Sequence, residues 1–182
     1  MIYRLPPAVA EGLLEWRRHL AQQFGFPEGE DLGSSRAAPV PLMPACFRYD
    51  GNLYRKIEEA LWSRAARSGS MEVVIVSALY GLLDLWEPIR YYNVAITDNV
   101  APGLRLARWW SERGLGRLLA EYIEGSGASV VHDFLSGAYV EVADALEQLG
   151  GPVKVYRHSY PGLGSGADHH RGWDVRKLLS QA

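Results

Sequence analysis

Cysteine is nearly absent from this chain of 182 residues, in which Cys46 stands alone. One cysteine excludes an internal disulfide and a zinc site built from cysteines. We expect its thiol to be a small buried hydrophobic group, with a reactive thiol as the alternative. A long apolar run is also lacking, because residues 73–86 are interrupted by Ser77, Gly81 and Asp84 and are too short to cross a bilayer. With no visible signal peptide, these absences predict a cytoplasmic protein that does not enter membranes.

An excess of positive charge is lacking as well, because 19 Lys and Arg residues face 21 Asp and Glu residues for a net charge of −2. A composition of 48% apolar and 22% charged residues excludes a disordered tail, a collagen-like repeat and a coiled coil. The length predicts a single domain over residues 1–182. Any contact with nucleic acid therefore needs a local basic patch. Residues 154–177, with five Lys and Arg against two Asp, are a candidate.

Five segments have the apolar spacing of helices, at residues 8–23, 53–67, 104–123, 137–149 and 170–179. Gly114 and Gly116 predict a break in the third of these helices. Ser136 is the expected N-cap of the fourth, which Gly150 and Gly151 end. Residues 27–44 are rich in Gly, Pro, Ser and charge, so they predict a long surface loop.

Two short apolar runs predict strands buried on both faces, at residues 72–77 and 129–135, and residues 153–157 predict a third short strand. Strands that alternate with helices predict an α/β fold with a mixed, partly parallel sheet flanked by helices. Ligands bind beyond the carboxyl ends of parallel strands, so we expect a polar cleft at that edge of the sheet. The polar side chains that follow the three runs include Ser77, Tyr80, Ser136, Tyr139, His158 and Tyr160.

Each of these groups also has a purely structural interpretation. Ser136 is equally explained as a helix cap, and the tyrosines as core aromatics with one polar end. Ser77 does not lie in a G-x-S-x-G motif, which argues against a serine hydrolase. Asp84 and Glu87 flank a turn and are either a general acid and base or surface turn residues. The pair Trp109-Trp110 is best explained as core packing.

The C-terminal third contains two further polar segments. The glycine-rich residues 162–166 precede the last helix and are either a loop that cradles a phosphate or a flexible connection. The run from Asp168 through His169 and His170 to Arg171 either contacts phosphate or is a solvated helix start. Adjacent histidines on a helix face different directions, and no third ligand stands at a recognisable spacing. We therefore expect no metal site and no cofactor.

Several motifs in order resemble the YaaA-like family of peroxide-stress proteins, from about residue 44 to the C-terminus. These motifs are RYDGNLY at residues 48–54, VSALYGLLD at 76–84, PIR at 88–90, DFLSGAY at 133–139, and HHRG at 169–172 followed by Arg176. The chain is short for the family, and the family's Ser-Pro-rich start is missing or altered. Residues 88–92 lack the tyrosine that the family carries after the proline, and His169-His170 replace an Asn-Lys pair.

The resemblance implies a mixed α/β fold with a cleft, a basic surface, a role in limiting oxidative damage, and DNA binding as the activity. It carries functional residues over to matching positions, which largely coincide with the polar groups at the strand ends. As catalytic candidates we name Asp50, Asp84, Tyr80 and Tyr139. As ligand-binding candidates we name Tyr49, Tyr54, Ser77, Arg90, Ser136, His169, His170 and Arg171.

Two functions follow as hypotheses. The first is a stress protein that binds nucleic acid through a local basic surface. The alternative is an enzyme that acts on a nucleotide, nucleoside or nucleobase, with Asp50 or Asp84 as acid or base and with Arg90 and Arg171 holding an anion. A small protein-interaction module is a third interpretation, which an apolar surface patch would mark. The oligomeric state stays open at this point.

Overall fold

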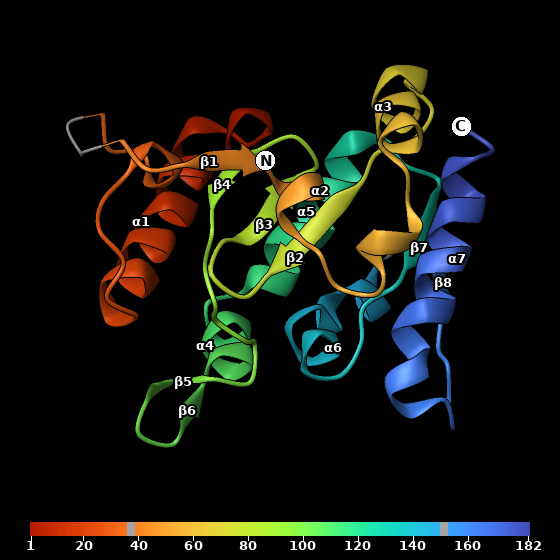
Figure 1. The fold of residues 1–182 in the computed structure, drawn as a ribbon. Helices are drawn as coiled ribbons and strands as arrows, with labels where there is room; N and C mark the ends of the chain where they lie inside the picture. The colour runs from red at the N-terminus through yellow and green to blue at the C-terminus, as the bar shows by residue number, and fades with distance from the viewer. Residues whose placement is uncertain (36–38, 150–152) are drawn as a thin grey trace.

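Small sheets and helices alternate along the chain in a computed structural model that describes residues 1–35, 39–149 and 153–182 (Figure 1). The α-helices of these residues are α1 Pro7–Gln23, α2 Ala45–Arg48, α3 Glu59–Ser68, α4 Leu106–Glu112, α5 Leu115–Ser126, α6 Ala138–Val142 and α7 Ala167–Leu179. The strands are β1 Leu42–Pro44, β2 Val74–Ser77, β3 Gly81–Asp84, β4 Pro88–Arg90, β5 Asn99–Ala101, β6 Leu104–Arg105, β7 Val130–Asp133 and β8 Lys154–Arg157. The 3-10 helices are η1 Ile2–Arg4, η2 Glu30–Leu32, η3 Tyr54–Lys56, η4 Asp144–Gln148 and η5 Gly164–Gly166.

The strands form two-stranded sheets of mixed direction, which confirms the predicted mixed, partly parallel α/β class. β2 with β3, β1 with β4, and β5 with β6 are antiparallel pairs, whereas β7 and β8 are parallel. Figure 1 shows α1 on one side of the molecule and α7 on the other, with the β2–β3 hairpin between them. Within the described residues, no helix combines the length and the apolar character needed to cross a membrane.

The expectation that three parallel strand ends share one sheet edge is wrong. Among the described residues, β2 pairs with β3 in an antiparallel hairpin, and β7 with β8 forms a separate parallel sheet. The hairpin arises because the chain turns at once after Ser77, at Gly81, where φ is +68°. A side chain at Gly81 would lie 2.9 Å from the ring of Trp110, so glycine is required there for space as well as conformation.

The strands are less buried than predicted. In β2, Ile75 and Ser77 are buried while their neighbours are half-buried, and in β7 only the last residue, Asp133, is buried. A two-stranded sheet has one face against the core and leaves the other accessible, which explains the alternation. The prediction of a strand buried on both faces is therefore wrong for β7, whereas the third predicted short strand is present as β8.

Several helix boundaries also differ from the expectation. The helix predicted over residues 53–67 begins at Glu59, because Tyr54–Lys56 form a 3-10 turn and Ile57 is extended. The helix predicted over 137–149 ends at Val142 and continues as a 3-10 helix over Asp144–Gln148. Ser136 does not cap it, since the N-cap position falls on Gly137 with φ of +54°. The expected stop at Gly150-Gly151 lies outside the described residues.

Other predicted boundaries hold. The first helix spans Pro7–Gln23, with Pro7 in its first turn, where the missing N–H costs nothing. Gly114, in the left-handed conformation, separates α4 from α5 as predicted. Trp109 and Trp110 are buried, and the Trp110 indole donates a hydrogen bond to the Ala78 carbonyl at 2.8 Å.

The surface-loop prediction for residues 27–44 is wrong in part. Asp31 and Leu32 are buried in η2, and the segment ends as strand β1. The Asp31 carboxylate forms a buried ion pair with Arg90, with an N–O distance of 2.6 Å. The same carboxylate accepts a hydrogen bond from the Tyr80 hydroxyl, which in turn accepts one from the Arg90 backbone N–H at 3.3 Å. We call this network of Asp31, Tyr80 and Arg90 the arginine clamp.

A second buried ion pair joins α1 to the turn before β4. Arg17 donates to Glu87 at 2.5 Å and to the backbone carbonyls of Tyr80 and Leu82. Burial opposes ionisation of Glu87, but Arg17 and the Met1 amino group outweigh it and hold the pKa of Glu87 below its usual value. The two buried pairs therefore fix the N-terminal third of the chain to the hairpin.

We predict that Arg90→Met lowers the free energy of unfolding by about 3–5 kcal/mol, because it leaves the Asp31 carboxylate buried without its partner. The measurement is urea unfolding followed by circular dichroism. The matched control is Arg108→Met, which removes an exposed ion pair with Glu112 and is expected to leave the midpoint unchanged. Equal midpoints for the two variants would show that the clamp contributes nothing to stability.

Candidate functional site

Three hydroxyl groups meet near the middle of the molecule. The Tyr49 and Ser77 oxygens are 2.9 Å apart, those of Tyr49 and Tyr92 are 2.7 Å apart, and those of Ser77 and Tyr92 are 2.8 Å apart. The Tyr80 backbone N–H donates to the same Ser77 oxygen at 3.2 Å. Three hydroxyls in a closed triangle satisfy one another, so this hydroxyl triangle needs no further partner.

The hydroxyl triangle is uncharged at neutral pH. Burial raises the pKa of the Tyr49 and Tyr92 phenols above their usual value. Burial also raises the pKa of Tyr54, whose ring stacks on Tyr49 at a centroid distance of 5.1 Å. Tyr139 belongs to the same neighbourhood, and burial raises its pKa to about 12. These phenols therefore act as neutral hydrogen-bonding and packing groups rather than as bases.

A pocket of about 270 Å³ opens beside these tyrosines. We call it the tyrosine pocket; it is lined by Arg48, Tyr49, Asp50, Gly51, Tyr54, Tyr91, Tyr92 and Asn93. Tyr91 stands at its mouth with 73% of its surface exposed. Asp50 is also exposed at the rim, where its carboxylate pairs with Arg55 at 3.3 Å. The pocket thus presents aromatic rings, with the Asp50 carboxylate at its rim and the half-buried Arg48 guanidinium in its lining, where Nε–H has no hydrogen-bond partner among the described residues.

The arginine clamp determines which way the two adjacent tyrosines point. Arg90 ends β4 and is held by Asp31, so the chain leaves the strand at a fixed place. Successive side chains of an extended chain point in opposite directions. Tyr92 accordingly reaches inward to Ser77, while Tyr91 faces solvent.

Helix α7 packs against the turn η3 that supplies Tyr54. A side chain at Gly172 would lie 2.6 Å from the Leu53 carbonyl oxygen, so glycine permits this close approach. Trp173, the next residue of α7, contacts the same turn: the Lys56 ammonium lies 5.6 Å from the centre of its ring. The Arg176 guanidinium lies 5.2 Å from the same ring and pairs with Glu58 at 2.7 Å.

A groove of about 690 Å³ lies between α3 and α7. Its lining residues are Glu58, Ala60, Leu61, Arg64, Trp173, Asp174, Arg176, Lys177 and Ser180. Half of the Trp173 surface is exposed at this groove. We define the α7 surface as Arg55, Lys56, Arg64, Trp173, Arg176 and Lys177. Because η3 contributes to both regions, the α7 surface continues from the tyrosine pocket.

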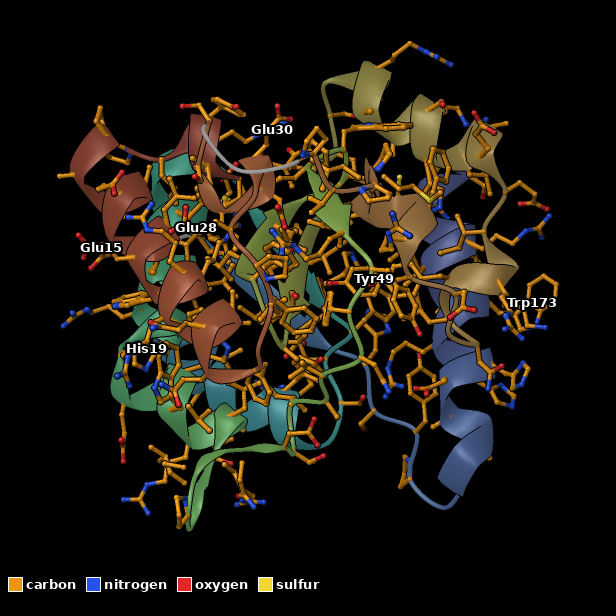
Figure 2. The ribbon with its side chains drawn as sticks, turned by 60° about the vertical axis from the view of Figure 1, so that its left-hand side comes forward. Glu15, His19, Glu28, Glu30, Tyr49 and Trp173 are labelled. Carbon is orange, nitrogen blue, oxygen red and sulfur yellow. The ribbon has the colours of Figure 1, made fainter. Side chains whose placement is uncertain are left out.

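Charge is distributed unevenly over the molecule. Figure 2 places Glu15, Glu28 and Glu30 on the α1 side and Trp173 on the α7 side, with Tyr49 between them. On the α7 surface and around the tyrosine pocket, six cations face three carboxylates. The cations are Arg48, Arg55, Lys56, Arg64, Arg176 and Lys177, and the carboxylates are Asp50, Glu58 and Asp174. A chain with a net charge of −2 therefore has a locally basic side.

The structure brings together some of the predicted site residues. Tyr49, Tyr54, Ser77 and Tyr139 lie around the hydroxyl triangle, and Asp50 lies at the pocket rim. Tyr80 and Arg90 are buried in the clamp behind it, where they support the site without facing the pocket.

The other predicted site residues lie elsewhere. Asp84 pairs with Arg4 at 2.8 Å and accepts a hydrogen bond from the Trp86 N–H at 2.9 Å, which holds a turn. His169 and His170 are exposed on α7, and Arg171 is buried there beside Asp168 and the Tyr160 ring. Ser136 is half-buried just before α6. A single polar cleft that gathers all these groups is not confirmed.

Sequence reasoning missed four residues that shape the site, namely Asp31, Tyr91, Tyr92 and Trp173. Tyr91 and Tyr92 could have been named from the sequence as site candidates, because these two tyrosines directly follow the candidate Arg90. Nothing in the sequence marked Asp31 as the partner of Arg90, because it stands in a polar stretch 59 positions away. Among the described residues, no three histidine, cysteine, aspartate or glutamate side chains group so as to hold a metal ion.

Comparison with known proteins identifies a family. A family model described as peroxide stress protein YaaA matches residues 12–165 of the chain. The match includes the hydroxyl triangle, the tyrosine pocket and the arginine clamp, whereas the whole of α7 lies beyond it. No curated protein matches the chain.

We predict that Ser77→Ala destabilises the fold by about 2 kcal/mol, because it leaves the Tyr80 N–H and the phenols of Tyr49 and Tyr92 short of a partner. Urea unfolding measures the loss. The control is Ser70→Ala, which truncates an exposed serine and should change the unfolding free energy by less than about 0.5 kcal/mol. If the two alanine variants unfold alike, the triangle has no energetic role.

We also predict that stability falls as the pH rises above about 10, the pKa of an unperturbed phenol in the unfolded chain. A raised pKa in the folded state stabilises below the unfolded pKa, and that contribution disappears as the pH approaches the folded value, about 12 for Tyr139. Urea unfolding at pH 8, 10 and 11 measures this decline. Tyr139→Phe, which cannot ionise, should decline less steeply, and an identical slope would contradict the prediction.

Proposed function

Because the chain belongs to the YaaA family of peroxide stress proteins, it has a role in peroxide stress, and we propose that it fulfils this role by binding nucleic acid. We place this activity in the cytoplasm, in keeping with a lone, buried cysteine. Burial raises the pKa of the Cys46 thiol to about 11, so the thiol is protonated at neutral pH and has little of the thiolate character that peroxide-reactive cysteines have.

One observation carries the proposal, namely the combination of cations with exposed aromatic rings along one side of the molecule. Tyr91 at the pocket mouth and Trp173 at the groove expose 73% and 50% of their surfaces. Lys56 and Arg176 lie against the Trp173 ring. Nucleic-acid surfaces combine positive side chains for the phosphates with aromatic faces for bases or sugars. The α7 surface has both components.

The charge distribution supports the same conclusion. Carboxylates on the α1 side repel phosphate, and the surplus of cations on the α7 side attracts it. The protein needs no overall positive charge for this mode of binding, because Coulomb interactions in physiological salt act over about 8 Å. A nucleic acid would therefore approach with the α7 side facing it.

The enzyme alternative has less support. Of the described residues that line the tyrosine pocket, Asp50 alone carries a carboxylate, and 86% of its side chain is exposed. An exposed carboxylate lacks the environment that adapts a general base to its task. The neighbouring phenols are neutral and hydrogen-bonded to one another. A thermal-shift screen with nucleotides, nucleosides and bases tests this alternative, and a ligand-dependent rise in melting temperature would favour it.

We predict that a fluorescently labelled DNA duplex binds at 50 mM salt, and that affinity falls roughly 40-fold at 200 mM salt if about three phosphates are contacted. Fluorescence anisotropy measures the affinity. The double variant Arg64→Ala/Lys177→Ala should reduce the slope of log affinity against log salt by about two, because each removed cation accounts for about one phosphate.

The control is Arg117→Ala, which removes an equally exposed cation from α5, away from the α7 surface. It should leave affinity and salt slope unchanged. The proposal fails if the unmodified protein shows no binding at 50 mM salt. It also fails if the double variant and the control behave alike.

A further inference from the structure

The outer face of the β7–β8 sheet carries a row of aromatic rings, part of which is exposed to solvent. His132 pairs in register with Tyr156, so these two residues lie on the same face of the sheet. Phe134 and His158 each stand one residue beyond the end of a strand, where Phe134 stacks on both His132 and His158. His132 is exposed, and Tyr156 exposes 51% of its surface. We call these four residues the ring face.

The rings are held in a near-parallel arrangement. The centroids of Phe134 and His158 lie 4.1 Å apart at an interplanar angle of 16°, and those of His132 and Tyr156 lie 5.3 Å apart at 18°. A hydrogen bond of 3.0 Å between His132 Nδ1 and His158 Nε2 joins the two pairs. Because both strands are already ordered, a ligand that stacks on these rings does not have to immobilise them.

The charges around the ring face favour an anionic ligand. Lys154 is exposed on the same face, two residues before Tyr156. Two carboxylates lie nearby. Asp133 of β7 is buried on the opposite face and pairs with Arg157 at 2.9 Å, and Asp174 of α7, on the side of His158, accepts a hydrogen bond from the Tyr160 hydroxyl at 2.6 Å. A ligand that combines flat rings with negative charge therefore fits this surface better than a protein segment of apolar side chains.

We propose that the ring face is a second nucleic-acid contact, on which unpaired bases of a single strand stack while Lys154 meets an adjacent phosphate. Base stacking on exposed aromatic side chains is the usual mode of single-strand recognition, and it tolerates any base because each has a flat face. The inference rests on the proposed nucleic-acid function but uses residues outside the α7 surface and the tyrosine pocket.

The histidine pair makes this contact sensitive to pH. The charged groups that face His158 are His132 and Asp133 of β7 and Asp174 of α7. Burial and the neighbouring imidazole lower the pKa of His158, so this imidazole is mostly neutral at neutral pH. As the pH falls, a proton taken up by the pair adds positive charge beside the phosphate. Affinity for a single strand should therefore rise between pH 8 and pH 5.5.

The test uses a labelled oligothymidylate, which has no stable duplex form, and fluorescence anisotropy at 50 mM salt. Tyr156→Ala should weaken binding roughly five-fold or more, the loss expected for one stacked base. His132→Gln/His158→Gln should remove the pH dependence between pH 5.5 and 8 while leaving some binding. The matched control is Tyr3→Ala, which removes a tyrosine that is 96% exposed on η1 and should have no effect.

Circular dichroism confirms that each variant is folded before binding is compared. If Tyr156→Ala binds oligothymidylate as tightly as the Tyr3→Ala control, the ring face is not a stacking site. Loss of oligothymidylate binding in Tyr156→Ala with duplex binding retained supports the inference. Duplex binding together with no oligothymidylate binding in the unmodified protein overturns the inference but leaves the proposed function intact. Absence of both overturns both.

Discussion

The buried ion pair of Asp31 and Arg90 is the constraint on which the candidate site depends. The Asp31 carboxylate and the Arg90 guanidinium are almost fully buried, so each charge is compensated by the other and would be destabilising without it. Tyr80 joins them from the turn after β2, and the clamp thereby ties η2, the β2–β3 hairpin and β4 together. Because Arg90 directly precedes Tyr91 and Tyr92, its position decides that the Tyr92 phenol reaches Ser77 while the Tyr91 ring stays exposed.

The hydroxyl network of the candidate site is self-contained. Its phenols are neutral and already hydrogen-bonded, and the carboxylate at the rim is open to solvent. The groups that remain accessible to a ligand are the faces of the aromatic rings and the cations beside them. Aromatic rings and an exposed lysine recur on the outer face of the β7–β8 sheet, where we propose the second nucleic-acid contact.

Local signals in the sequence predicted local structure well. Helix α1, the break at Gly114 and the strand ending at Ser77 follow from apolar spacing, glycine conformation and side-chain branching within a few residues. The family motifs also placed Tyr49, Tyr54 and Ser77 in one site, and the hydroxyl triangle includes two of these three. Helix length was predicted less well, because the 3-10 turn of Tyr54–Lys56 is stabilised by ring contacts that no local pattern encodes.

By itself, therefore, the sequence determined the mixed α/β class, the family, and the positions of the longer helices and of strands β2, β7 and β8. The tertiary structure alone decided that β2 turns back on β3 instead of joining β7 and β8, that Asp31 meets Arg90, and that cations from α3, η3 and α7 meet around one tryptophan. The physical reason is that backbone propensity acts over a few residues. Ion pairing and ring stacking, by contrast, join side chains that are far apart in the sequence, and no local pattern predicts which of them meet.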